Sequence, residues 1–254
     1  MRIKVLFIFL FAFSLIFSVS PVWAYHPLIT DDTGTQGEGR WQYDFNVEYG
    51  YDKDKGIKTK ELSLNNTLTY GLTDNLDIGI GIPYVYWKEE DHESIDESGF
   101  SDIELGLKYR FYETKGLNVA IKPSITIPSG DEERGLGTGR VTGRFFLILD
   151  REFRDLTFFF NAGYIRNENR IDERKNLWHL SLAGEYRIKE GFKVVGNIGM
   201  EKDPDRTSHK NPAFLIIGTV YTFSDAFDLS AGIKRGLTEP ETDTSLMAGI
   251  TLRF

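Results

Sequence analysis

Residues Thr244 to Phe254, which read T-S-L-M-A-G-I-T-L-R-F, are the stretch that decides the fold. Every second residue from Leu246 to Phe254 is apolar, whereas most residues between them are small, polar or charged. A β-strand places successive side chains on opposite faces, so this stretch has one apolar face and one mixed face. The stretch also finishes on an aromatic residue of the apolar face. It therefore predicts a strand whose apolar face meets lipid, provided that the rest of the chain can complete a barrel.

The same alternation recurs through most of the chain. In the segment that begins at Trp41, six large apolar or aromatic side chains face one way and only polar or small ones face the other. Twelve strands are expected in all, over residues 41–51, 61–72, 76–86, 101–112, 117–127, 140–149, 156–166, 178–187, 192–201, 213–223, 227–234 and 244–254. Pro123 lies inside one of them and predicts a bulge or local unpairing, because proline cannot donate to a ladder. Residues 213–223 are apolar on both faces, which leaves their register open.

The connections between these segments are sorted by length. Long, charged connections (52–58, 87–99, 128–139, 167–176, 202–212 and 236–243) alternate with short turns such as 72–75 and 113–116. An even strand count with short turns at one end and longer loops at the other is typical of outer-membrane barrels. A soluble β-sandwich gives no reason for this sorting. The predicted fold class is therefore an all-β, membrane-spanning antiparallel β-barrel of about 12 strands over residues 41–254. Its last strand should pair with the Trp41 strand, because lipid does not tolerate open sheet edges.

The residues before the barrel divide into two parts. Met1 to Ala24 has a basic start, an apolar core and small residues before a cleavage point, which predicts a signal peptide. A membrane-spanning helix is the alternative, but the apolar run is short for one. Residues 25–40 lack periodicity and predict an irregular lead-in or partial plug. Secretion through the inner membrane and a place in the bacterial outer membrane follow from this organisation.

Composition excludes several classes of function. Without Arg2 and Lys4 of the signal, 28 basic residues face 38 acidic ones, which argues against a nucleic-acid partner. The absence of cysteine excludes a thiol nucleophile, a disulfide and a lipoprotein anchor. The acidic run Glu89 to Glu97 could bind divalent cations that bridge lipopolysaccharide, although a solvated loop is the simpler interpretation. No cofactor and no metal site are predicted, and outer-membrane lipids and lipopolysaccharide are the expected surroundings.

Three segments together resemble a known family. They are His26-Pro27-Leu28-Ile29-Thr30-Asp31-Asp32-Thr33-Gly34-Thr35-Gln36-Gly37, Tyr70-Gly71-Leu72-Thr73-Asp74-Asn75-Leu76-Asp77 and Gly135-Leu136-Gly137-Thr138-Gly139. The first is similar to the opening of the outer-membrane barrels filed as phenol-degradation meta-pathway (MetA-pathway) transporters, and the other two to its recurrent internal segments. The resemblance implies a barrel in the outer membrane of a Gram-negative cell and, loosely, transport. Phe254 likewise resembles the terminal aromatic residue that such barrels present to the barrel-assembly machinery during biogenesis.

The inward face of the predicted barrel carries many charges. The expected lumenal residues are Asp44, Glu48, Glu61, Asp77, Asp102, Glu104, Lys108, Arg110, Lys122, Arg140, Arg144, Glu185, Arg187, Lys193, Asp228, Lys234 and Arg253. They would line a water-filled path whose charges tune selectivity, or they would neutralise one another in a narrow lumen. The first alternative predicts a channel for small molecules, with aromatic or hydrophobic compounds suggested by the family name alone. The second predicts a closed structural or surface-interaction barrel.

The lead-in carries three residues of interest, His26, Asp31 and Asp32. These residue types bind metals, but one histidine and two adjacent acids are a weak ligand set. The segment is therefore expected to fold inward as a plug, or to form a polar tether that pairs with lumenal arginine.

Some outer-membrane barrels are hydrolases, so an enzymatic function is an alternative to transport. A barrel hydrolase needs a nucleophile, a base and an orienting group within hydrogen-bond reach. His179 and Ser181 occupy successive inward positions of one strand. Barrel lipid hydrolases place their serine on the lipid side, and this pair faces the other way. No catalytic residue and no enzymatic activity are therefore predicted.

Overall fold

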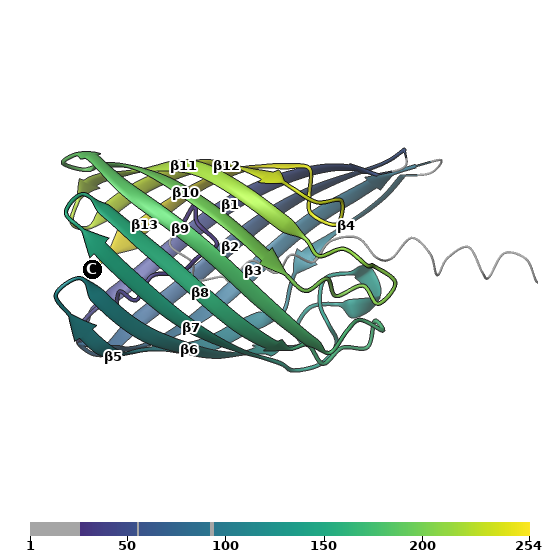
Figure 1. Cartoon of the computed structure of the whole chain (residues 1–254). Helices are drawn as coiled ribbons and strands as arrows, with labels where there is room; N and C mark the ends of the chain where they lie inside the picture. The colour runs from purple at the N-terminus through teal and green to yellow at the C-terminus, as the bar shows by residue number, and fades with distance from the viewer. Residues whose placement is uncertain (1–25, 55, 92–93) are drawn as a thin grey trace, which may run out of the picture.

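The computed structural model describes residues 26–54, 56–91 and 94–254, and the strands among them form one antiparallel sheet that closes into a barrel (Figure 1). The expected signal peptide lies outside the described residues. The strands are β1 (Trp41–Asp54), β2 (Ile57–Thr73), β3 (Leu76–Glu90), β4 (Ser94–Phe100), β5 (Ile103–Thr114), β6 (Leu117–Ile127), β7 (Thr142–Phe153), β8 (Leu156–Arg166), β9 (Asn176–Lys189), β10 (Phe192–Glu201), β11 (Ala213–Ser224), β12 (Phe227–Gly236) and β13 (Thr244–Arg253). A 3-10 turn, η1 (Glu132–Arg134), lies between β6 and β7. Within the described ranges, no helix has the length and apolar character to cross a membrane.

The first and last strands close the barrel. β1 pairs with β13 from Gln42↔Arg253 to Tyr51↔Thr244, and β2 pairs with both β1 and β3. Beyond the last paired residues, the Trp41 and Phe254 amides each donate to the other residue's carbonyl, at 2.8 and 3.0 Å. The prediction that the terminal stretch pairs with the Trp41 strand is confirmed. The pairing of β1 with β13 therefore closes the barrel wall.

The described residues form thirteen strands, which occupy twelve positions around the barrel, as predicted. β4 and β5 together occupy one position beside β3. β4 pairs with the outer half of β3, up to Tyr84↔Phe100, and β5 pairs with the inner half, from Gly81↔Glu104. The register changes by one residue between them, so Ser101 and Asp102 interrupt the wall at this point.

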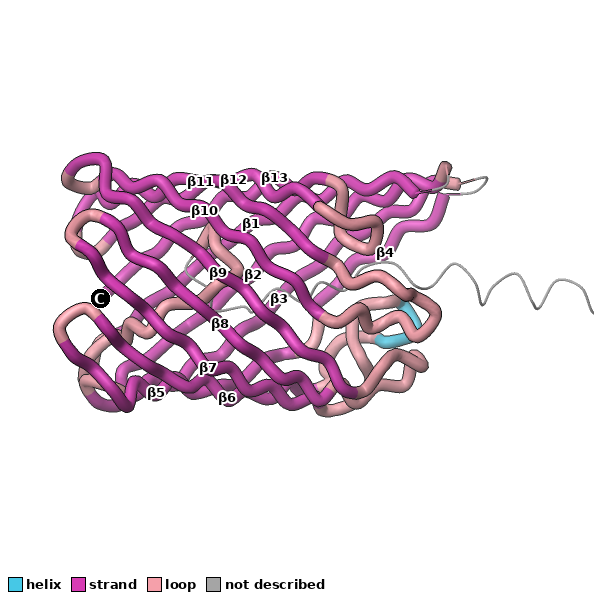
Figure 2. The backbone as a smooth tube through the Cα atoms, in the orientation of Figure 1, coloured by secondary structure: helices cyan, strands magenta, loops and turns pink. Residues whose placement is uncertain are grey.

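Two expected long loops are instead strand. β1 and β2 extend to Asp54 and Ile57, and β3 and β4 extend across most of the predicted acidic loop 87–99. The prediction was wrong here because it ended each strand where apolar alternation stopped, whereas a ladder needs only paired backbone groups. The remaining long connections, 128–141, 167–175, 202–212 and 237–243, gather at the end opposite the short turns (Figure 2).

The two faces of the wall differ as predicted. Large apolar residues on the outer face are exposed, for example Leu246 at 55 % and Ile217 at 67 %. Many inward residues are buried even when charged, and Lys234 is only 2 % exposed. The register of β11 is also resolved, because Phe214 and Ile216 face inward while Leu215 and Ile217 face outward. An apolar inner face in a polar barrel requires a partner inside the lumen.

Candidate functional site

The partner of these apolar inner residues is the N-terminal segment, residues 26–40, which runs through the barrel interior (Figure 2). Leu28 packs in a buried cluster with residues of four neighbouring strands, Phe159, Ala183, Val195 and Val220. Ile29 packs in a second cluster with Phe214, Ile216 and Met247. Burying two such side chains stabilises the segment by about 1.5–3 kcal/mol each. The apolar inner face of β11 and the central phenylalanine of β8 therefore hold this segment.

The backbone of the segment is not part of the sheet, so its polar groups need other partners. Two inward asparagines supply them. Asn197 Oδ1 accepts from the amides of Ile29 and Thr30 at 2.8 and 3.1 Å. Asn161 accepts from the Asp31 amide and donates to the Asp31 carbonyl, both at 2.8 Å. These bonds fix the path of the segment without any strand pairing.

Asp31 carries the strongest polar contacts of the segment. Its two carboxylate oxygens lie 2.9 Å from Lys108 Nζ and 2.8 Å from Lys122 Nζ. The lysines come from adjacent strands, β5 and β6, and all three side chains are at least nine-tenths buried. Burial by itself raises the pKa of Asp31, but the two lysines outweigh burial and hold the pKa below its ordinary value. Asp32 lies farther from Lys108, at 3.6 Å, and is more exposed.

The segment is held again as it leaves the lumen. Thr33 donates to Asp150 through both its amide and its hydroxyl, at 2.9 and 2.5 Å. Asp77, which is 1 % exposed, accepts from the Gln36 amide. The other end of the segment is held by a 2.6 Å hydrogen bond between His26 Nδ1 and the Ser230 hydroxyl on β12.

Most of the other predicted lumenal charges lie inside the barrel in pairs or with polar partners. The ion pairs are Arg144–Glu104 (3.2 Å), Lys193–Glu185 (2.9 Å), Arg253–Asp228 (2.6 Å) and Lys234 with both Glu48 (2.9 Å) and Glu241 (3.2 Å). Asp44 accepts hydrogen bonds from Thr251 and Gln42, and Glu61 accepts one from Ser63. Arg253 also contacts Gln42, as the closing register predicts.

Three predicted lumenal arginines lie elsewhere. Arg140 is exposed in the loop before β7, which begins only at Thr142. Arg187 is exposed near the turn end of β9, where the wall meets solvent. Arg110 lies at the same end, where it contacts Glu113 and the Asp74 carbonyl. The predicted strand position of Arg140 is wrong, because β7 begins only at Thr142. Arg187 keeps the inward parity of Glu185, but strand parity gives a side and not a depth.

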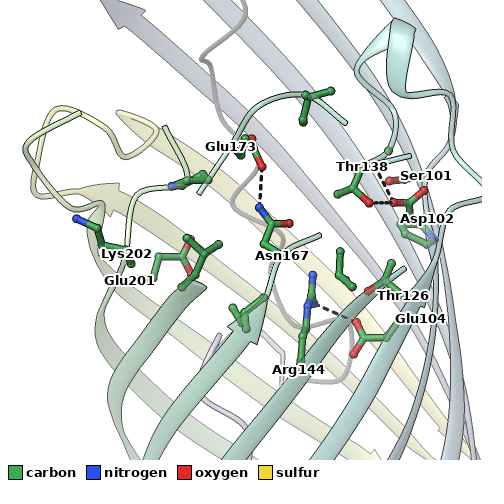
Figure 3. Close-up of a pocket in the computed structure, with 17 residues that line it drawn as sticks. Ser101, Asp102, Glu104, Thr126, Thr138, Arg144, Asn167, Glu173, Glu201 and Lys202 are labelled. Atoms are coloured by element: carbon green, nitrogen blue, oxygen red, sulfur yellow. Dashed lines mark hydrogen bonds and ion pairs between the residues drawn. The ribbon is translucent and has the colours of Figure 1, made fainter. Parts of the chain in front are cut away.

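Two cavities lie at different heights of the lumen. The inner cavity, of about 210 Å³, is polar and lies between residues 26–36 and the wall formed by β1, β12 and β13. The outer cavity, of about 80 Å³, lies under the long loops (Figure 3). Asp102 shapes the loop over it by accepting from the amides of Gly130 and Thr138 and from the Thr138 hydroxyl.

The His179–Ser181 pair does form, and it includes a third residue. His179 Nε2 is 3.0 Å from the Ser181 hydroxyl, and His179 Nδ1 is 3.3 Å from a Glu201 oxygen. The order matches a hydrolase triad, but His179 and Ser181 are 2 % and 4 % exposed and pack among wall residues. A nucleophile must reach its substrate, so this arrangement favours a structural network. The part of the chain that the structure describes contains no group of three or more residues able to hold a metal ion.

Sequence reasoning missed the residues that hold the segment: Leu28, Ile29, Asn161 and Asn197. Two signals could have found them. Residues 213–223 are apolar on both faces, and Phe159 interrupts the alternation of its strand on the inward side. An inward apolar patch in a polar lumen indicates a segment that covers it.

A closed antiparallel wall with twelve strand positions, an apolar outer face and a polar, partly filled interior defines the class of outer-membrane β-barrels. Within that class, the family model described as "Putative MetA-pathway of phenol degradation" matches residues 30–254, and the chain belongs to that family. The resemblance found in the sequence is thereby confirmed.

Solved structures of several barrels are similar to this chain. The COG4313 outer membrane channel from Pseudomonas putida F1 has a TM-score of 0.68 at 15 % identity, over 88 % of this chain and 98 % of that one. The KdgM porin has a TM-score of 0.56 at 9 % identity, over 84 % and 99 %. The Pseudomonas putida toluene transporter TodX has a TM-score of 0.50 at 8 % identity, over 88 % and 95 %. At these identities the likeness shows the fold. A comparison with curated proteins found no match.

Proposed function

We propose that this protein is an outer-membrane channel that passes small hydrophobic or aromatic molecules, and that residues 26–40 are its plug. The observation that carries the proposal is the lumenal segment itself. Residues 26–36 are held by side-chain contacts and ion pairs rather than by a β-ladder, so they can leave without breaking the wall, whereas Gly39 and Arg40 stay bonded to Gly71 of β2. Family membership and the similarity to a channel, a porin and a toluene transporter support the same function.

The surroundings of the barrel follow from its surface. The exposed apolar outer face suits outer-membrane lipids, and the long loops at one end suit contact with lipopolysaccharide. Phe254 follows the last residue of β13 and is 70 % exposed, which suits recognition by the barrel-assembly machinery. The signal peptide over residues 1–24 would direct the chain across the inner membrane.

A reversible lock on the plug tests the proposal. The natural sequence contains no cysteine, so Thr33→Cys combined with Asp150→Cys introduces a single thiol pair at two side chains in direct contact. In planar bilayers, the oxidised protein should show fewer opening events than the reduced protein, and reduction should restore them. Each single cysteine variant serves as the control and should respond to neither treatment.

A closed structural barrel is the second candidate, because the lumenal charges described above pair with one another and the plug fills the interior. Absence of conductance from the reduced protein, with the barrel shown to be folded by a heat-dependent gel shift, would support this candidate and overturn the channel.

A further inference from the structure

The outward faces of β1, β2 and β3 change from apolar to basic near the end of the barrel opposite the C-terminus (Figure 1). One cross-strand row on these faces consists of Tyr49, Leu62 and Tyr86. The next outward row toward the loops consists of Tyr51, Lys60 and Lys88. Successive outward residues of a strand are roughly 7 Å apart, so the surface changes character within one row. Such a boundary, with tyrosines beside it, is typical of the level at which a barrel leaves the hydrocarbon.

The basic surface continues beyond this row and is not balanced by its acids. The following outward row consists of Lys53, Lys58 and Glu90, and Asp96 on β4 lies opposite Lys88. We call the four lysines of these two rows the lysine patch. The patch faces two acids, whereas the whole chain has a net charge of −8. Its sign is therefore opposite to that of the protein as a whole.

Lys60 and Lys88 form the centre of the lysine patch, because they lie directly opposite each other on β2 and β3. Like charges in opposed positions of adjacent strands repel. Glu90 offsets this repulsion, since its Oε1 lies 3.2 Å from Lys60 Nζ and 2.8 Å from Lys88 Nζ. One carboxylate leaves two ammonium groups with an excess positive charge. The side chains of Lys60, Lys88 and Glu90 are 36 %, 32 % and 32 % exposed, so a second anion can reach the two lysines from outside the barrel.

The position of the lysine patch identifies this anion. The patch lies just beyond the apolar surface, at the end that carries the long loops and faces the cell exterior in an outer-membrane barrel. The outer leaflet there consists of lipopolysaccharide, whose phosphate groups lie on the sugars directly above its acyl chains. Lysine binds phosphate as a flexible point charge, and its stem can lie along apolar surface while the ammonium group stays in water. Phospholipid headgroups belong to the opposite leaflet, at the end with the short turns.

We infer that the lysine patch is a binding site for a phosphate group of lipopolysaccharide in the outer leaflet. The phosphate oxygens accept from the ammonium groups of Lys60 and Lys88, and the acyl chains of the same molecule contact the row of Tyr49, Leu62 and Tyr86. This inference rests on the outer-membrane surroundings proposed above, for which it names the contact, and it is independent of conduction through the lumen.

Three lipids test the site: lipid A with its phosphates, lipid A from which the phosphates have been removed, and phosphatidylglycerol. The refolded full barrel is titrated with each lipid in the same detergent, and bound lipid is counted by native mass spectrometry. Each lysine near an anionic surface contributes about fivefold, so two lysines should favour phosphorylated over dephosphorylated lipid A about thirtyfold. Phosphatidylglycerol should bind more weakly than phosphorylated lipid A, because its acyl chains and headgroup do not match the two rows together.

Two variants change the charge of the site in opposite directions. Lys60→Gln with Lys88→Gln should weaken binding of phosphorylated lipid A about thirtyfold and leave dephosphorylated lipid A unchanged. Lys115→Gln with Lys189→Gln removes the same charge from two exposed lysines at the end with the short turns, and this control should change neither affinity. Glu90→Gln removes the carboxylate that competes for both lysines, so the affinity for phosphorylated lipid A should rise about fivefold.

The outcomes separate the site from its alternatives. Equal affinity for both forms of lipid A, or an equal loss in the control variant, would overturn the site. Binding of phosphatidylglycerol as tight as that of phosphorylated lipid A would overturn the assignment to lipopolysaccharide. A heat-dependent gel shift shows that each variant is folded, and the gain expected for Glu90→Gln tests the site even if the double glutamine variant does not fold. Bilayer conductance reports on the channel separately, so a conducting barrel without selective binding would lose only the site.

Discussion

Neutralising Asp31 should release the plug. Asp31→Asn keeps the size of the side chain and the backbone bonds to Asn161, but it removes the shared counterion of Lys108 and Lys122. Removing one partner of a buried ion pair costs about 3–5 kcal/mol, because the remaining charge stays buried without compensation. Asp32, 3.6 Å from Lys108, compensates part of that loss, so we take the lower value. A weakening of about 3 kcal/mol corresponds to roughly a hundredfold shift from the closed toward the open state.

The shift can be measured in planar bilayers as the open probability of single barrels. Asp31→Asn should raise the open probability by up to two orders of magnitude until it saturates. Hydrogen exchange at the Ile29 and Thr30 amides gives a second readout, because both donate to Asn197 only while the plug is in place. Their exchange should accelerate together with opening.

Asp32→Asn is the matched control for this experiment. It removes the same charge one residue away. The Asp32 side chain is 25 % exposed and lies 3.6 Å from Lys108, which is farther than the Asp31 contacts. Its effect should stay below about tenfold, as for other weakly paired, partly exposed charges. If Asp31→Asn and Asp32→Asn gave the same open probability, or if Asp31→Asn left amide exchange unchanged, the ion pairs would not be what retains the plug.

Three further outcomes are expected. Leu28→Ala should weaken plug docking by about 2–4 kcal/mol, because it leaves a cavity among four wall strands, and protease cleavage of the segment in the folded barrel should become faster. Gly71→Ala should shift the backbone around Gly37, where the plug leaves the lumen, because the new Cβ would lie 1.9 Å from the Gly37 carbonyl oxygen. An unchanged hydrogen-exchange rate of the Gly37 amide would contradict this. Acidification should loosen the start of the segment, because burial lowers the pKa of His26 from 6.5 to about 4. The His26 contribution to docking is then strongest above pH 6.5 and weakens as the pH falls toward 4, and His26→Gln should reduce this dependence of protease cleavage on pH.

The wall of this barrel could be predicted from the sequence because its signal is local. Side chains alternate with a period of two along each strand, so the lipid-facing set from Trp41 to Phe254 is visible in one chain without knowledge of its neighbours. Closure then follows from the cost of an open edge in lipid, and the pairing of β1 with β13 confirms it. Strand ends were less predictable, as β1 and β3 demonstrate, because polar residues can continue a ladder beyond the membrane.

The contents of the lumen depended on contacts that the sequence does not encode locally. Asp31 meets Lys108 and Lys122 across 77 and 91 residues, and Leu28 meets side chains from four strands at once. Alternation predicts that a residue faces inward, but it gives neither the height of that residue in the barrel nor the residue opposite, so it could not show that Arg187 lies near the turns. Only the closed three-dimensional wall brings those strands around a common centre. The sequence therefore determined the barrel and its lipid-facing surface, and the tertiary structure decided what fills it, because filling a lumen requires many distant residues to meet at one place.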